Sequence, residues 1–178
     1  VLNGKLCLQF TNRFWNQRGS WGVGNGWTFA DTGYQSTWDT TRGLDGVSGI
    51  LVNYTGGSAA DALALKDVYA DSDNSKKVSR DAQQFLSDLE PVYPGITQCW
   101  NGKATESKSY LSPLYKSGYS YYEPGQYQWF AGYEYERQGR VLFAGEHTHG
   151  EFQGWMEGAA LTGKTAAADI VADLRFPH

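Results

Sequence analysis

Long apolar runs and clusters of basic residues are absent from this 178-residue sequence. No stretch approaches the ~20 apolar residues that a membrane-spanning helix needs. The 15 Lys and Arg residues are outnumbered by 19 Asp and Glu residues, for a net charge of −4. They form no basic patch of the kind that binds nucleic acid. We therefore expect a soluble protein that binds neither nucleic acid nor a membrane, and its compartment stays open, secretion included.

Cysteine is equally scarce. Cys7 and Cys99 lie far apart, too few for a disulfide framework or a zinc cluster, and they form no CxxC pair. His147 and His149 stand two residues apart without a third candidate ligand nearby. We expect no bound metal.

A dinucleotide-binding loop is also missing. Gly22, Gly24 and Gly26 approach the GxGxxG pattern, but Trp27 occupies the position of the third glycine. No strand-to-helix pattern surrounds them, so we do not expect these glycines to cradle a phosphate.

Aromatic residues and glycine are abundant, with 7 Trp, 12 Tyr, 8 Phe and 22 Gly. A β-rich domain with tight turns has this composition, and so does a pocket lined by aromatic rings. A noncatalytic aromatic-rich binding module, for example for carbohydrate, is therefore one hypothesis for function.

Apolar periodicity predicts several regular elements. Alternation predicts a strand over residues 1–10, and an apolar run predicts a buried strand over 49–54. Capping-box spacing from Ser58 predicts the start of a helix. Residues 78–89 have the apolar spacing of a second helix. Residues 95–139 are rich in aromatics without a regular pattern, which we interpret as functional irregular structure.

The last forty residues predict a strand, a turn and a helix. Residues 140–144 are a short apolar run, 145–154 a glycine-containing turn, and 155–174 a helix. A helix that starts after such a turn directs free N–H groups and a partial positive charge at a bound group. One face of this helix carries small and apolar residues: Met156, Ala160, Gly163, Ala167, Ile170, Val171 and Leu174.

Those forty residues resemble the closing motif of the flavin-containing amine oxidases, the family of monoamine, polyamine and L-amino-acid oxidases. Residues 143–148 read FAGEHT and residues 154–159 read GWMEGA, followed by Gly163 and the pair Ala166-Ala167. The motif is long and has several fixed positions, so it is specific.

Two earlier stretches resemble the same family. Lys5 precedes Phe10 by five residues and Trp15 by ten, as in the family strand that places a lysine beside flavin N5. Residues 118–121 with Pro124-Gly125 resemble the family's GSYSY segment with one residue missing. The matches run from residue 5 to residue 170.

The resemblance implies an α/β fold, as the C-terminal part of a two-domain FAD-dependent amine oxidase. Residues 1–137 would belong to a mixed-sheet substrate domain, and residues 138–178 would supply the closing strand and helix of the FAD-binding domain. The portion with the GxGxxG segment would precede Val1 or be a separate piece of a processed enzyme. We therefore expect a hetero-oligomeric assembly with that N-terminal portion.

The resemblance also implies roles for particular residues. Lys5 would hold a water beside flavin N5 as the catalytic residue, with an exposed edge lysine as the alternative. Tyr119 and Trp155 would form the two walls of a substrate cage, together with Gly154. The cofactor-binding residues would be Gly145, Glu146, Gly154, Trp155, Met156 and Ala159.

Within this set, Glu146 would contact the ribityl or phosphate region, and the Met156 N–H would donate to flavin O2. The alternatives are a solvated turn carboxylate for Glu146 and a core-filling side chain for Trp155. FAD would be noncovalent, because Gly118 and Tyr119 stand where covalently linked members have cysteine.

The implied reaction is the oxidation of a C–H bond next to an amine by FAD and oxygen. It forms an imine, then ammonia and a 2-oxo acid or an aldehyde, with hydrogen peroxide. Trp155 favours an L-amino acid as substrate, and a monoamine or polyamine oxidase is the alternative.

Overall fold

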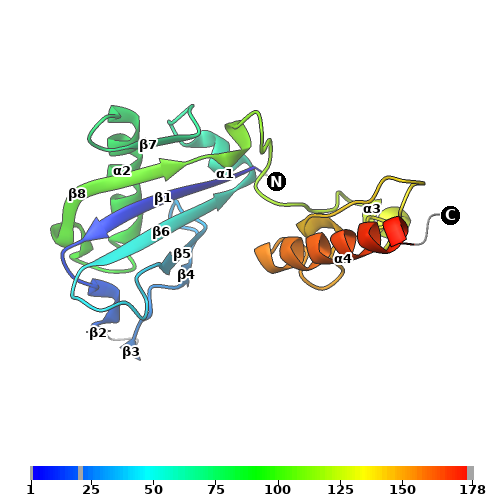
Figure 1. Ribbon diagram of the computed structural model, residues 1–178. Helices are drawn as coiled ribbons and strands as arrows, with labels where there is room; N and C mark the ends of the chain where they lie inside the picture. Colours follow the sequence, from blue (N-terminus) through cyan, green and yellow to red (C-terminus); the bar gives the residue numbers. More distant parts are fainter. Residues whose placement is uncertain (1, 20–21, 176–178) are drawn as a thin grey trace. The chain divides into compact units, whose positions relative to one another are not determined.

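The computed structural model describes residues 2–19 and 22–175, so Val1 of the predicted first strand lies outside them. Residues 2–118 form one compact unit, and residues 119–175 form another (Figure 1). The predicted assignment of residues 1–137 and 138–178 to a substrate domain and an FAD-binding domain stays a prediction.

The first unit is built on a six-stranded sheet in the order β4-β5-β6-β1-β8-β7, with every neighbouring pair antiparallel (Figure 1). The parallel pairs expected of a mixed sheet do not occur among the described residues. In sheet order the strands span Thr28–Phe29, Ser36–Asp39, Gly49–Gly56, Asn3–Phe10, Trp100–Ser107 and Tyr69–Asp71. A separate ribbon pairs β2 (Arg18–Gly19) with β3 (Gly22–Val23). The predicted strands at 1–10 and 49–54 are confirmed as β1 and β6.

Helix α2 (Lys76–Leu89) packs on one face of this sheet and completes the core. Leu6, Leu8 and Phe10 are fully buried on the covered face of β1. The buried apolar side chains of α2 recur at helical spacing, which confirms the predicted helix: Val78, Ala82, Phe85, Leu86 and Leu89.

Shorter elements complete the first unit. The helix expected from Ser58 is α1, a short helix at Gly57–Ala62. Single 3₁₀ turns are η1 (Phe14–Asn16), η2 (Ile96–Cys99) and η3 (Ser109–Leu111).

Strand β8 corrects the expectation that residues 95–139 lack regular structure. Its sequence, WNGKATES, has polar residues on both faces and therefore no apolar alternation. The strand forms because β1 and β7 hydrogen-bond to its two sides. Pairing on both edges thus overrides a weak local preference.

The second unit contains α3 (Gln126–Phe130), η4 (Glu146–Thr148) and α4 (Met156–Arg175). The predicted helix at 155–174 is confirmed by α4. The predicted buried strand at 140–144 is wrong, because Val141 makes only an isolated bridge to Gln138, and Val141 and Phe143 are exposed. A strand needs a neighbour to satisfy its N–H and C=O groups, and the described part of this unit contains no other strand.

Helix α4 keeps most of its apolar face exposed. Ile170, Val171 and Leu174 are 48%, 46% and 77% exposed, and Gly158 is the only buried residue among its described positions. Arg137 makes a bidentate ion pair with Asp173 and ties the preceding loop to the helix. No helix in the described ranges is both long and apolar enough to cross a membrane.

Candidate functional site

Glu146 is the centre of a hydrogen-bonded cluster in the second unit. The Ser120 backbone N–H donates to Glu146 Oε1 at 2.6 Å, and the Ser120 hydroxyl donates to Oε2 at 2.8 Å. The Gly154 N–H donates to Oε2 at 2.6 Å. Burial raises the pKa of Glu146, but the hydrogen bonds from Ser120 and Gly154 outweigh it, so the net pKa lies below the ordinary value.

Glu146 is half-buried and hydrogen-bonded to Ser120 and Gly154, whereas the alternative interpretation made it a solvated turn carboxylate. Glu146 Oε1 accepts one hydrogen bond from the described residues, and a carboxylate oxygen can accept a second. The contact of Glu146 with a cofactor stays a prediction.

The cluster brings two predicted substrate residues together. Gly154 has φ +84°, a backbone conformation that favours glycine, and a Cβ at this position would lie 3.9 Å from Cδ2 of Tyr119. Tyr119 is half-buried. The next residue, Trp155, is 69% exposed, so it does not fill a core within the described residues. Tyr119 and the Gly154-Trp155 turn therefore lie side by side.

Gly145 is required by the turn before η4. Its φ is +149°, and a Cβ there would come within 2.6 Å of the His147 ring. Its N–H donates to the Thr162 hydroxyl at 3.0 Å, and the same hydroxyl reaches the Gly145 carbonyl at 3.1 Å. Thr162 lies on α4, so Gly145 is joined to the helix that follows.

The start of α4 has free donors suited to a cofactor. The N–H of Met156 donates to no described residue, and the Met156 side chain is 92% exposed. Ala159 is half-buried on the next turn. A 20-residue helix presents a partial positive charge at this end. The donor set therefore fits the electron-rich carbonyl edge of a flavin ring.

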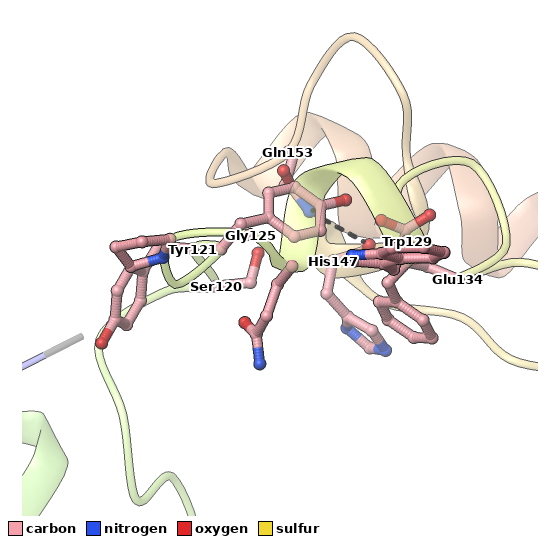
Figure 2. Close-up of a pocket in the computed structure, with 11 residues that line it drawn as sticks. Ser120, Tyr121, Gly125, Trp129, Glu134, His147 and Gln153 are labelled. Carbon is pink, nitrogen blue, oxygen red and sulfur yellow. Dashed lines mark hydrogen bonds between the residues drawn. The ribbon is translucent and has the colours of Figure 1, made fainter.

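An aromatic hollow of about 630 Å³ opens beside this cluster (Figure 2). Its size is in the range of small-molecule sites. Gln153 donates to the His147 carbonyl at 3.4 Å and to the Tyr122 hydroxyl at 3.3 Å. The hollow is lined by Ser120, Tyr121, Tyr122, Pro124, Gly125, Gln126, Trp129, Phe130, Glu134, His147 and Gln153.

None of the predicted site residues lines this hollow, although Ser120, His147 and Gln153 are their immediate neighbours in sequence. Its aromatic lining includes Trp129 and Phe130 of α3. The sequence signal for them was aromatic content alone, without a spacing that singles them out.

Lys5 lies in the first unit, exposed on the central strand β1. It is therefore not an edge lysine, and it occupies the face opposite the buried Leu6 and Leu8. Its partners across the sheet are Tyr54 on β6 and Ser107 on β8. Its predicted catalytic role stays a prediction.

Sequence reasoning missed the aromatic neighbours of Lys5. Tyr54 lies directly opposite Lys5, and the Tyr54 ring packs against Trp38 with centroids 5.2 Å apart. The Asn3 amide donates to the Tyr54 hydroxyl at 3.0 Å. The proximity of Tyr54 to Lys5 depends on the register between two strands, which residue spacing within one strand does not reveal.

A second ionisable cluster is buried under the sheet, away from Lys5. Glu106 and Lys108 are fully buried, with Glu106 Oε1 3.9 Å from Lys108 Nζ. Lys108 Nζ donates to the Leu63 carbonyl at 2.7 Å. Burial and then the negative charge of Asp81 raise the pKa of Glu106 to about 7, and burial lowers the pKa of Lys108.

Among the described residues, no group of three or more His, Cys, Asp and Glu side chains is arranged to hold a metal ion.

Residues 2–171 match the model of the flavin containing amine oxidoreductases, and the chain belongs to this family. YobN of Bacillus subtilis (strain 168), named as a candidate L-amino-acid oxidase, is 28% identical over 171 residues, which are 93% of this chain and 32% of YobN.

Two solved structures share the fold. Cyclohexylamine oxidase from Brevibacterium oxydans IH-35A superposes with a TM-score of 0.75 at 22% identity, covering 98% of this chain and 36% of the oxidase. Wild-type putrescine oxidase bound to putrescine gives a TM-score of 0.69 at 20% identity, covering 96% of this chain and 35% of that chain. These likenesses confirm the predicted α/β fold class as a portion of an amine oxidase fold. The chain spans about a third of the length of each of these proteins.

Proposed function

We propose that this chain is the C-terminal part of an FAD-dependent oxidase that deaminates a primary amine, with an L-amino acid as the favoured substrate. The observation that carries the proposal is the joined arrangement of Tyr119, Glu146 and Gly154 at the start of α4. It occurs in a chain that matches the amine oxidoreductase family over residues 2–171.

Residues of the second unit would hold the cofactor. The free Met156 N–H and the positive end of α4 would face the carbonyl edge of the flavin ring. The chain would lie close to the ring at Gly145, Gly154, Trp155 and Ala159. Glu146 would accept a hydrogen bond from a cofactor hydroxyl. When bound, FAD would supply the two-electron acceptor for the reaction. We propose noncovalent binding, because Gly118 offers no thiol for a linkage.

Residues of this chain would also position the substrate. Tyr119 and Trp155 would enclose the amine and exclude water, since aromatic faces favour a nitrogen-bearing ligand. Lys5 would hold a water beside flavin N5. The substrate would lose a hydride from the carbon and a proton from the nitrogen. Water would convert the resulting imine to a carbonyl compound and ammonia, while oxygen would take up the two electrons and two protons as hydrogen peroxide.

The remaining portion of the enzyme, with the nucleotide-binding GxGxxG segment, would be supplied outside this chain. The proposal is supported by the share of the relatives that the chain covers, about a third. The exposed apolar face of α4 is the surface that such a portion would cover.

The choice of substrate has support on both sides. Trp155 and the similarity to YobN favour an L-amino acid. The fold shared with cyclohexylamine oxidase and putrescine oxidase supports simple amines and polyamines as the second candidate.

The test is to purify the assembled protein and measure its flavin content, then assay a panel of L-amino acids, monoamines and polyamines for ammonia and hydrogen peroxide. The matched D-amino acids serve as controls. We expect bound flavin and the highest kcat/KM with an L-amino acid. Turnover of simple amines alone would move the assignment to an amine oxidase, and an assembly without flavin would favour a noncatalytic binding module.

A further inference from the structure

Ser120 and Gly154, the sequence neighbours of Tyr119 and Trp155, are both hydrogen-bonded to one carboxylate, that of Glu146. Ser120 follows Tyr119 directly and donates its N–H and its hydroxyl to Glu146. Gly154 precedes Trp155 directly and donates its N–H to the same side chain. One side chain thus bridges residues 26 and 8 positions away in sequence.

The carboxylate is well suited to this bridge. An ionised carboxylate accepts hydrogen bonds at both oxygens and donates none, so all three donors are satisfied at once. The net lowering of the Glu146 pKa keeps it ionised at neutral pH. Neither partner N–H belongs to a helix or strand that would hold it otherwise. Glu146 therefore joins the two segments directly beside Tyr119 and Trp155, in addition to the Gln153–Tyr122 hydrogen bond.

We propose that Glu146 is a positioning residue that sets the spacing between Tyr119 and Trp155, and thereby the width of the site in which an amine is held. The inference rests on the proposed function, and it gives Glu146 a role additional to any contact with a cofactor. Without Glu146 the segments that carry Tyr119 and Gly154 would lose these shared hydrogen bonds, and the separation of the Tyr119 and Trp155 side chains would become more variable.

Glu146→Gln is the most informative substitution. Glutamine has almost the same shape but carries one amide NH₂ in place of an oxygen, so at least one of the Ser120 and Gly154 N–H groups faces another donor. Glu151→Gln is the matched control, because Glu151 is exposed on the neighbouring loop and its side chain accepts no hydrogen bond from a described residue.

The first readout is independent of activity. Hydrogen exchange at the Ser120 and Gly154 amides, measured by NMR in the assembled protein, should quicken about tenfold or more in Glu146→Gln, as expected for loss of a hydrogen bond to a charged group. Both amide resonances of the parent should titrate together below the ordinary glutamate pKa. Unchanged exchange at both amides would overturn the proposal whether or not the protein is an oxidase.

The second readout separates positioning from cofactor retention. With rates expressed per bound flavin, because Glu146 would also contact the cofactor, we expect Glu146→Gln to lose at least tenfold in kcat/KM for the best substrate, mainly through KM. Ser120→Ala removes only the hydroxyl donor and should give a smaller loss, and adding it to Glu146→Gln should cost little more. An unchanged kcat/KM per bound flavin would overturn the positioning role. A parent without amine oxidation would refute the proposed function, while the amide exchange would still decide whether the bridge exists.

Discussion

Glu106 should make the stability of the first unit depend on pH. Its side chain is fully buried, and its two oxygens accept no hydrogen bond from the described residues. Burial and the charge of Asp81 raise its pKa from 4.5 to about 7, against the opposing attraction of Lys108. The group is therefore neutral in the folded protein at pH values where it is ionised in the unfolded chain.

The size and sign of the effect follow from this pKa difference. Below pH 4.5 the carboxyl group of Glu106 is protonated in both the folded and the unfolded state, so the stabilisation of the folded state is fully present. As the pH rises to about 7, the unfolded chain releases its proton first, and the stabilisation is lost. At about 1.4 kcal/mol per pKa unit, the loss is about 3 kcal/mol of unfolding free energy. The free energy of unfolding is therefore lower at higher pH.

Glu106→Gln isolates this contribution, because glutamine imitates the protonated carboxyl group and does not titrate. Urea unfolding at pH 5 and pH 8, about two units below and one above the raised pKa, gives the free energy from its linear dependence on urea. The parent should lose stability between these pH values relative to Glu106→Gln, while Glu151→Gln should follow the parent. Equal pH dependence in the parent and Glu106→Gln would refute the raised pKa.

Three further predictions concern the proposed oxidase site in the assembled enzyme. Lys5→Met should leave the protein folded and flavin-bound but slow flavin reduction or reoxidation about tenfold or more, measured by stopped flow; parental rates would show that Lys5 has no role. Acid precipitation should release all flavin to the supernatant, and colour retained in the pellet would contradict noncovalent binding. Trp155→Ala should lower kcat/KM about tenfold at unchanged flavin content, because it removes ~1–3 kcal/mol of aromatic packing. Flavin loss in step with activity would instead show that Trp155 supports the fold.

The elements with one buried face were predictable from the sequence, and those held by distant partners were not. Residues 1–10 and 78–89 alternate or repeat with the period of their secondary structure, so β1 and α2 were visible. Strand β8 lacked that signal because its polar Glu106 is buried. Residues 140–144 had the apolar composition of a strand, but the described part of their unit offers no strand to pair with them.

The candidate site was likewise predictable from the sequence only in part. The turn around Gly145 and Gly154 and the helix start at Met156 were visible because their residues are close in sequence. The bridge from Glu146 to Ser120 was not, since it joins residues 26 positions apart through side-chain geometry. The placement of Tyr54 beside Lys5 likewise depends on how β1 and β6 align.

Anaerobic mixing of the assembled flavoprotein with a primary amine is the most direct test of the central claim, that this chain belongs to an enzyme that oxidises amines with FAD. The visible absorption of oxidised flavin is followed with an L-amino acid, with cyclohexylamine and with buffer alone. The account predicts rapid loss of that absorption with at least one amine and its return when oxygen is admitted. Flavin that stays oxidised with every amine tested, or an assembly that carries none, would contradict the account.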